Sequence, residues 1–121
     1  MNCKLYSVRV FVSDWEKSVA FYSETLGLSV LFAGPEMGWA ELDTGAARLA
    51  LERVDPNDPE SAGLSGRFVA VSLQVDDVQA TYDELTSRGI EFLGPPERQP
   101  WGGVLAHFRD PEGNVLTLLS S

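Results

Sequence analysis

A strand-to-helix junction stands near the start of the chain and reads Val12-Ser13-Asp14-Trp15-Glu16-Lys17-Ser18-Val19-Ala20-Phe21-Tyr22. In the residues before it, valines alternate with other side chains, which is the period-two pattern of a strand with one buried face. After it, apolar residues recur at helical spacing as far as Leu26. Ser13 with Glu16 fits a capping box, and Asp14 is a second candidate for the helix cap. The segment therefore predicts a strand followed by a helix.

The same pattern returns in the second half of the chain. Apolar residues alternate over residues 71–75, Asp76-Asp77 supplies capping side chains, and a helical pattern runs to Leu85. Gly27 and Gly89 follow the two helical patterns at the position where a left-handed residue ends a helix. The chain therefore reads as a repeat of one supersecondary unit.

Each half continues with three more predicted strands. These cover residues 28–33, 39–42 and 48–51 in the first half, and residues 90–93, 104–108 and 115–119 in the second. A polar linker rich in proline and glycine, residues 54–67, separates modules at about 5–53 and 68–120. Modules of about 50 residues are too small to bury a sheet face alone. We therefore expect residues 1–121 to form one domain whose modules pack within a chain or across a dimer.

Composition and charge restrict the classes of function. Of the 121 residues, 44% are hydrophobic and 22% charged, which is typical of a globular protein. The net charge of −9 and the absence of a basic stripe argue against nucleic-acid or membrane partners. The acidity favours solubility and would attract a cationic ligand. The single cysteine, Cys3, excludes an internal disulfide, and the N-terminus lacks the apolar run of a signal peptide, so we expect a cytoplasmic protein.

The repeat resembles the vicinal oxygen chelate superfamily, which includes glyoxalase I, extradiol dioxygenases, fosfomycin-resistance enzymes and bleomycin-resistance proteins. The resemblance is carried by the junction quoted above, by Leu26-Gly27-Leu28, and by Asp110-Pro111-Glu112-Gly113-Asn114. It implies an α+β fold in which two βαβββ modules form curved mixed sheets around a cavity. It also implies a homodimer, because members of the bleomycin-resistance branch commonly build their pockets across two chains.

The resemblance also identifies four positions that hold a metal ion in the metal-dependent members. When Gly45 is aligned with Gly113, these positions are Ser7, Leu49, Ala70 and Thr117. Enzymes of the family place His, Gln or Glu there. Leucine and alanine offer no ligand atom, and neutral hydroxyls are poor ligands for a divalent metal. We therefore expect neither a metal nor another cofactor.

His107 and Glu52 are the candidates for a replacement metal ligand. His107 is the only histidine, and the sequence leaves open whether it projects into the cavity or onto the opposite face. Glu52 would need a bulge to reach the cavity, because the alignment makes Leu49 the equivalent position. No Ser-His-acid set is visible around His107, and Cys3 has no histidine near it in the sequence, so no catalytic residue is predicted.

Period-two alternation from the four positions predicts a mainly apolar cavity with a few polar groups, as in a small-molecule pocket. Trp39 and Trp101 suit stacking on planar or cationic ligands, with core or dimer packing as the alternative. Arg9 either pairs with an anionic group of the ligand or is a solvated or ion-paired strand residue. The candidate ligand-binding residues are Arg9, Phe11, Trp39, Leu49, Ser72, Gln74, Trp101, His107 and Thr117.

The sequence favours a metal-free protein, resembling the bleomycin-resistance branch, that sequesters an aromatic or cationic small molecule. One alternative is a lyase, isomerase or dioxygenase of the same fold, with a non-standard metal site or with metal-free acid–base chemistry around His107, Arg9 or a glutamate. A second alternative is a structural or regulatory module whose own side chains fill the pocket. Ligand identity cannot be read from the sequence.

Overall fold

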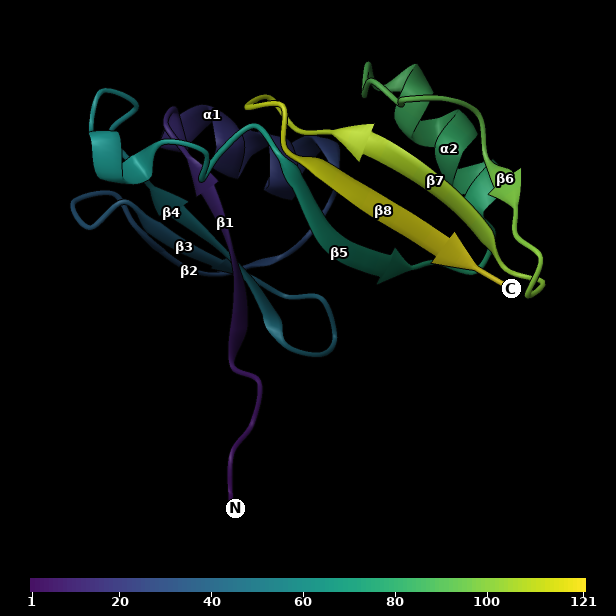
Figure 1. Ribbon diagram of the computed structural model, residues 1–121, viewed down its shortest axis with the longest axis horizontal. Helices are drawn as coiled ribbons and strands as arrows, with labels where there is room; N and C mark the ends of the chain where they lie inside the picture. The colour runs from purple at the N-terminus through teal and green to yellow at the C-terminus, as the bar shows by residue number, and fades with distance from the viewer. The chain divides into compact units, whose positions relative to one another are not determined.

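The chain folds into two compact units, which the computed structural model describes over residues 1–121. Module one covers Met1–Ser65 and module two covers Gly66–Ser121. Each unit contains one helix that lies along a four-stranded sheet (Figure 1). The predicted α+β class and the order strand, helix, strand, strand, strand are confirmed in both units.

Module one contains the first sheet, whose strand order is β1-β4-β3-β2. Strands β1 and β4 pair in parallel, and the other pairs are antiparallel. Helix α1 continues into a π-helical turn, η1. The bounds are β1 Ser7–Val12, α1 Trp15–Ala20, η1 Phe21–Thr25, β2 Val30–Gly34, β3 Trp39–Leu42 and β4 Arg48–Arg53.

Module two repeats this arrangement with strand order β5-β8-β7-β6. Strands β5 and β8 pair in parallel, while β7 pairs antiparallel with both β8 and β6. A short 3-10 turn, η2 (Pro59–Ser61), precedes this unit. The bounds are β5 Phe68–Gln74, α2 Val78–Ser87, β6 Glu97–Arg98, β7 Val104–Arg109 and β8 Val115–Ser120.

Each sheet has a helix face, which packs against the helix of its own module, and an open face on the other side. Period-two alternation places apolar residues on the helix face and mixed residues on the open face. In module two, the helix face is marked by the ring contacts Tyr82–Phe92 and Phe92–Phe108, which join α2 to β7. Residues buried to 2% exposure or less on the two helix faces include Val10, Val12, Leu42, Leu49, Leu51, Ala106, Phe108, Leu116 and Leu118.

The two helices are short and begin at aspartate caps. Asp14 accepts a hydrogen bond from the Lys17 amide at 3.2 Å, so the second of the two predicted caps is the one used. Asp77 caps α2 by accepting from the Ala80 amide at 3.1 Å. None of the helices combines the length and the hydropathy that a bilayer crossing requires.

The predicted strand over residues 90–93 is wrong. Only an isolated bridge between Phe92 and Phe108 forms there, and the edge strand of the second sheet is β6. Pro95-Pro96 follows this segment, and proline has no amide hydrogen to extend a ladder. The chain therefore leaves β7 after the Leu93 amide bonds to the His107 carbonyl at 2.9 Å, and returns to it as β6.

Candidate functional site

A row of polar side chains crosses the open face of module two. Strand register places Ser72, Thr117 and His107 side by side on β5, β8 and β7. His107 Nδ1 lies 2.8 Å from Thr117 Oγ1, within hydrogen-bond distance. The structure therefore resolves the face of His107: it lies on the same face as Thr117, which the sequence could not decide.

A bulge in β5 shapes this row. Phe68 is in register with Val115, but Ser72 is in register with Thr117, so the intervening stretch of β5 has two more residues than the facing stretch of β8. Ala70 lies in this stretch with φ of 62°, in the left-handed region where an alanine costs about 1–2 kcal/mol. Before the bulge, the Phe68 ring packs against the His107 ring in a T-shaped arrangement, with ring centroids 6.0 Å apart.

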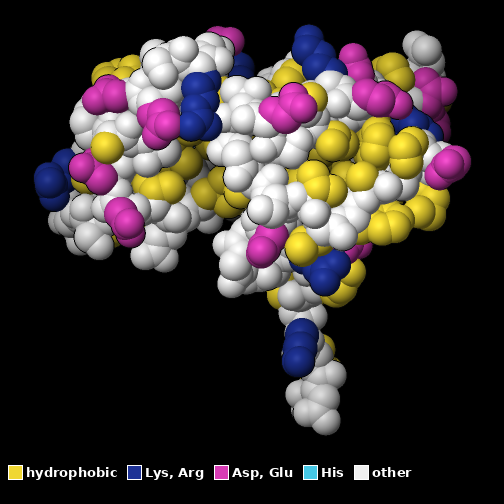
Figure 2. Space-filling model, turned by 180° about the vertical axis from the view of Figure 1, so that it is seen from behind, with side chains coloured by type: hydrophobic (Ala, Val, Ile, Leu, Met, Phe, Trp, Pro, Cys, Tyr) yellow, Lys and Arg dark blue, Asp and Glu magenta, His cyan; other side chains and the backbone are white.

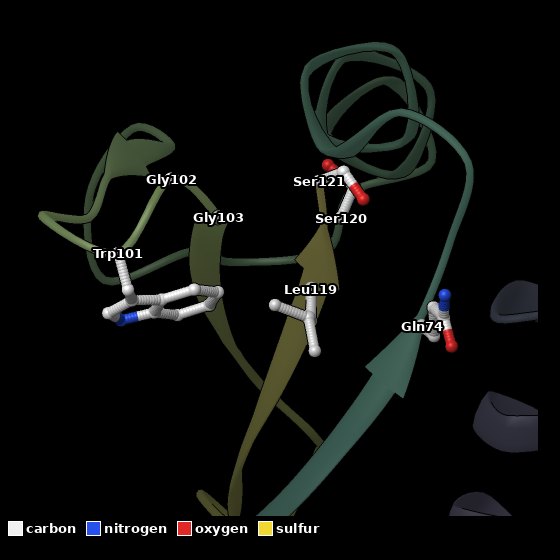
Figure 3. Close-up of a pocket in the computed structure, with 7 residues that line it drawn as sticks. All are labelled: Gln74, Trp101, Gly102, Gly103, Leu119, Ser120 and Ser121. Carbon is white, nitrogen blue, oxygen red and sulfur yellow. The ribbon is translucent and has the colours of Figure 1, made fainter.

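A pocket lies at the end of this face (Figure 3). Its volume is about 420 Å³, and its lining includes Gln74 from the end of β5 and Leu119 from β8. Trp101 forms the opposite wall, and its indole ring points toward Leu119 in Figure 3. Module two thus brings together two predicted site residues, Gln74 and Trp101, although the predicted set as a whole stays a prediction.

Trp101 is positioned by the turn that carries it. The ring lies against Gly103 so closely that a Cβ atom there would be 2.0 Å from the ring atom Cζ3. The turn is closed by hydrogen bonds from the Gln99 amide to the Gly103 carbonyl at 2.7 Å and from the Gly102 amide to the Gln99 carbonyl at 2.9 Å. Trp101 remains 66% exposed, so most of its ring area is open to a ligand.

The polar groups around this pocket are available for binding. No side-chain hydrogen bond within the chain involves Ser72, Gln74 or the Trp101 indole. An exposed donor or acceptor without a protein partner can exchange water for a ligand group at little cost. The open face of module two therefore combines an aromatic wall with unused hydrogen-bonding groups.

Module one differs, because its open-face polar groups are already paired with each other. Arg9 Nη1 forms an ion pair with Glu52 Oε1 at 3.1 Å, and its guanidinium lies 5.4 Å from the centroid of the Phe11 ring. Arg9 is therefore an ion-paired strand residue, while its contact with a ligand stays a prediction. Glu52 also lies on the open face, in register with Phe11 and Trp39, so it needs no bulge to reach it.

Glu41 is the residue of this face that sequence reasoning missed. It is 7% exposed and accepts hydrogen bonds from Trp39 Nε1 at 2.7 Å, from the Tyr6 hydroxyl at 2.8 Å and from Arg48 Nη1. The Trp39 and Tyr6 hydrogen bonds hold the pKa of the Glu41 carboxyl below its usual range, because both donate to the charged form. The signal in the sequence was weak. Trp39 and Glu41 are two residues apart and so lie on the same face of the strand, but a single glutamate in a strand usually points to solvent.

Leu49 does not belong to the open face, and its assignment to the cavity is wrong. It is 2% exposed and in register with Val8 and Leu42 on the helix face of module one. Ser72 in β5 corresponds to Arg9 in β1, because both stand five residues before the helix cap, and Arg9 is in register with Ala50. Ala50 therefore occupies the place that Thr117 has in module two.

The residues at the four family metal positions do not fit a divalent metal. After the correction they are Ser7, Ala50, Ala70 and Thr117, and the Thr117 hydroxyl already contacts His107. No group of three or more His, Cys, Asp or Glu side chains converges in the structure. Metal sites in proteins need several such side chains with nitrogen, thiolate or carboxylate ligands.

Comparisons with known proteins agree with this architecture. A family model described as Glyoxalase/Bleomycin resistance protein/Dioxygenase superfamily matches residues 4–118. A bleomycin resistance protein from Klebsiella pneumoniae is 30% identical, over 89% of this chain and 85% of that protein. A superfamily member from Sphaerobacter thermophilus superposes with a TM-score of 0.85 at 31% identity, covering 100% of this chain and 99% of that chain. The antibiotic binding protein TnmS3 from Streptomyces superposes with a TM-score of 0.79 at 36% identity, covering 98% and 96%.

Proposed function

Because the chain belongs to the Glyoxalase/Bleomycin resistance protein/Dioxygenase superfamily, we propose that it binds and sequesters a small aromatic or cationic molecule without a metal ion. The observation that carries this proposal is the pocket of module two, where Trp101 faces Leu119 and Gln74. Support comes from two similar proteins, one named for bleomycin resistance and one for antibiotic binding. The proposed biological role is protection against a toxic compound such as an antibiotic.

The chemistry of the pocket supports a planar ligand. An exposed indole offers a large flat surface with a negative face, which favours aromatic rings and cations. The unpaired Gln74 amide in the pocket lining provides both donors and an acceptor to orient the bound molecule, and the Ser72 hydroxyl lies two residues away along β5 on the same face. The net charge of −9, with acidic side chains spread over both modules in Figure 2, would draw a cation toward the protein.

The proposal includes a homodimer, supported by an exposed apolar edge. Strand β2 is the outer strand of its sheet, and Val30, Leu31 and Phe32 on it are each more than 40% exposed. Hydrophobic side chains also gather on the surface of module one, from which the N-terminal arm extends (Figure 2). Exposed apolar edge strands in native proteins are commonly covered by a partner. Light scattering on the purified protein would give the mass of the assembly.

Replacing Trp101 by alanine is expected to weaken ligand binding about 3- to 10-fold, the loss of one aromatic contact worth up to about 1.5 kcal/mol. The ligand would first be found by titrating antibiotics and aromatic cations, starting with bleomycin, while following tryptophan fluorescence. Calorimetry would then give the affinity of the variant. Because Trp101 is exposed, the thermal unfolding of the variant should match that of the unchanged protein.

Leu93→Ala is a suitable control, because Leu93 is also an exposed apolar residue of module two but does not line the pocket. Its affinity should stay unchanged. Equal affinities for Trp101→Ala and the unchanged protein would remove Trp101 from the site. Turnover of an α-keto aldehyde with glutathione, or of a catechol, would contradict sequestration and favour an enzyme of the same fold.

A further inference from the structure

Glu41 connects several side chains on the open face of module one. Its buried carboxylate receives hydrogen bonds from side chains of three separate segments: Tyr6 in the N-terminal arm, Trp39 in β3 and Arg48 in β4. A buried carboxylate without such partners would be costly. The three donors and the acceptor therefore fix one another in one arrangement.

This arrangement determines what the face can offer to a ligand. The Trp39 indole N–H and the Tyr6 hydroxyl both donate to Glu41, so the part of each side chain that is left for a ligand is its aromatic surface. The Arg48 guanidinium lies over the Tyr6 ring, 5.3 Å from its centroid, so the two flat groups already stack on each other and each keeps its other face for a ligand. Arg9, Phe11 and Glu52 repeat the combination of guanidinium, ring and carboxylate beside it.

The charges of this face balance. Arg48 pairs with Glu41, and Arg9 pairs with Glu52, so neither guanidinium is left to attract an anion. Guanidinium groups whose edges are occupied by carboxylates still stack through their flat faces. Recognition on this face would therefore depend on flatness and aromatic character rather than on ligand charge.

We propose that Glu41 is a positioning residue that holds Trp39, Tyr6 and Arg48 as a rigid stacking surface for flat aromatic ring systems. This inference rests on the proposed function, because it adds a second aromatic-binding surface, on module one, for ligands of the same chemical class. Glu41 acts through its neighbours and need not touch the ligand itself.

The first test compares Glu41→Gln with Glu52→Gln, using proflavine as a flat aromatic probe. Glutamine has one acceptor oxygen and an amide NH₂ group that only donates, so it cannot accept from Trp39, Tyr6 and Arg48 together. Proflavine binding, measured by its fluorescence, should weaken about 3- to 10-fold in Glu41→Gln. Glu52→Gln removes a more exposed ion pair on the same face and should change binding less than about twofold. Cyclohexylamine, an amine without a flat ring, should not compete.

The second test follows the titration of Tyr6 and needs no ligand. Its Tyr6→Phe variant keeps the inference testable if Glu41→Gln folds poorly. The hydrogen bond to Glu41 raises the pKa of Tyr6, because it is made by the protonated phenol. Ultraviolet difference absorbance should show the Tyr6 titration moving to lower pH in Glu41→Gln, and the Tyr6→Phe variant identifies that titration. Tyr6 is 59% exposed, so Tyr6→Phe should fold normally and weaken proflavine binding about twofold by loosening the surface.

The outcomes separate this inference from the proposed function. If Trp101→Ala weakens binding of the identified ligand while Glu41→Gln binds proflavine like the unchanged protein, the proposed function stands and the role of Glu41 is rejected. An unchanged Tyr6 titration in Glu41→Gln would also reject it. If the unchanged protein binds neither proflavine nor any compound of the panel, the proposed function fails and the inference fails with it.

Discussion

Leu49→Ala is expected to lower the free energy of unfolding by about 2–5 kcal/mol, the range for removing a buried leucine side chain. Leu49 is 2% exposed and lies between Val8 and Leu42 on the helix face of module one. The side chain cannot be replaced by water there, and the surrounding strands can close only part of the cavity. Urea denaturation followed by circular dichroism would measure the loss.

Leu5→Ala is the matched control, because Leu5 is 72% exposed and the same substitution should change stability by less than about 0.5 kcal/mol. Ligand affinity should be unchanged in both variants once the protein is folded. A small loss of stability in Leu49→Ala, together with weaker ligand binding, would show that Leu49 faces the open side and that the strand register described above is incorrect.

Leu49 was predicted on the wrong face of its strand because the sequence does not give the register of β4. The alternation of apolar and other side chains predicted β4 as a strand. Deciding which of its residues point to the helix face required the number of residues in the turn before it. Aligning Gly45 with Gly113 shifted the strand by one residue, and a shift of one residue moves every side chain to the opposite face. The hydrogen-bonded register, which places Ala50 beside Arg9, could not be counted from the sequence.

Features determined by local backbone chemistry were predicted more successfully. Gly27 and Gly89 were expected to be left-handed at the helix ends, and their φ angles of 92° and 87° confirm this. Asp77 caps α2 as expected. These predictions succeeded because the turn or cap depends on residues adjacent in sequence.

Features that depend on contacts between distant segments were not predictable. The Glu41 cluster joins the N-terminal arm to β3 and β4, with Tyr6 35 residues away from Glu41 in sequence. The contact of the Trp101 ring with Gly103 depends on the path of one turn. The sequence showed which residue types could form the site. Only the folded chain shows which of their hydrogen-bonding groups are paired within the protein and which are available to a ligand.

Asn114→Ala is expected to lower the free energy of unfolding by about 2–3 kcal/mol, because it leaves buried polar groups without partners. Asn114 is fully buried, and its Oδ1 accepts from the Gly66 amide at 2.8 Å while its Nδ2 donates to Asp110 Oδ2 at 3.0 Å. Asp110 is itself 5% exposed and accepts from the Asn114 amide at 2.9 Å. The substitution therefore removes partners from a buried carboxylate and a backbone amide together.

The position of Asn114 connects this loss of stability to the site. Gly66 lies just before β5 and Asn114 just before β8, so the Asn114 side chain joins the starts of the two parallel strands that carry Ser72 and Thr117. We therefore expect Asn114→Ala to speed hydrogen exchange of the β5 amides more than that of β1. Asp43→Ala is the control: Asp43 is exposed, its side chain accepts from the Gly45 amide, and its loss should cost less than about 1 kcal/mol. Equal stability losses in the two variants would mean that the Asn114 hydrogen bonds do not hold β5 against β8.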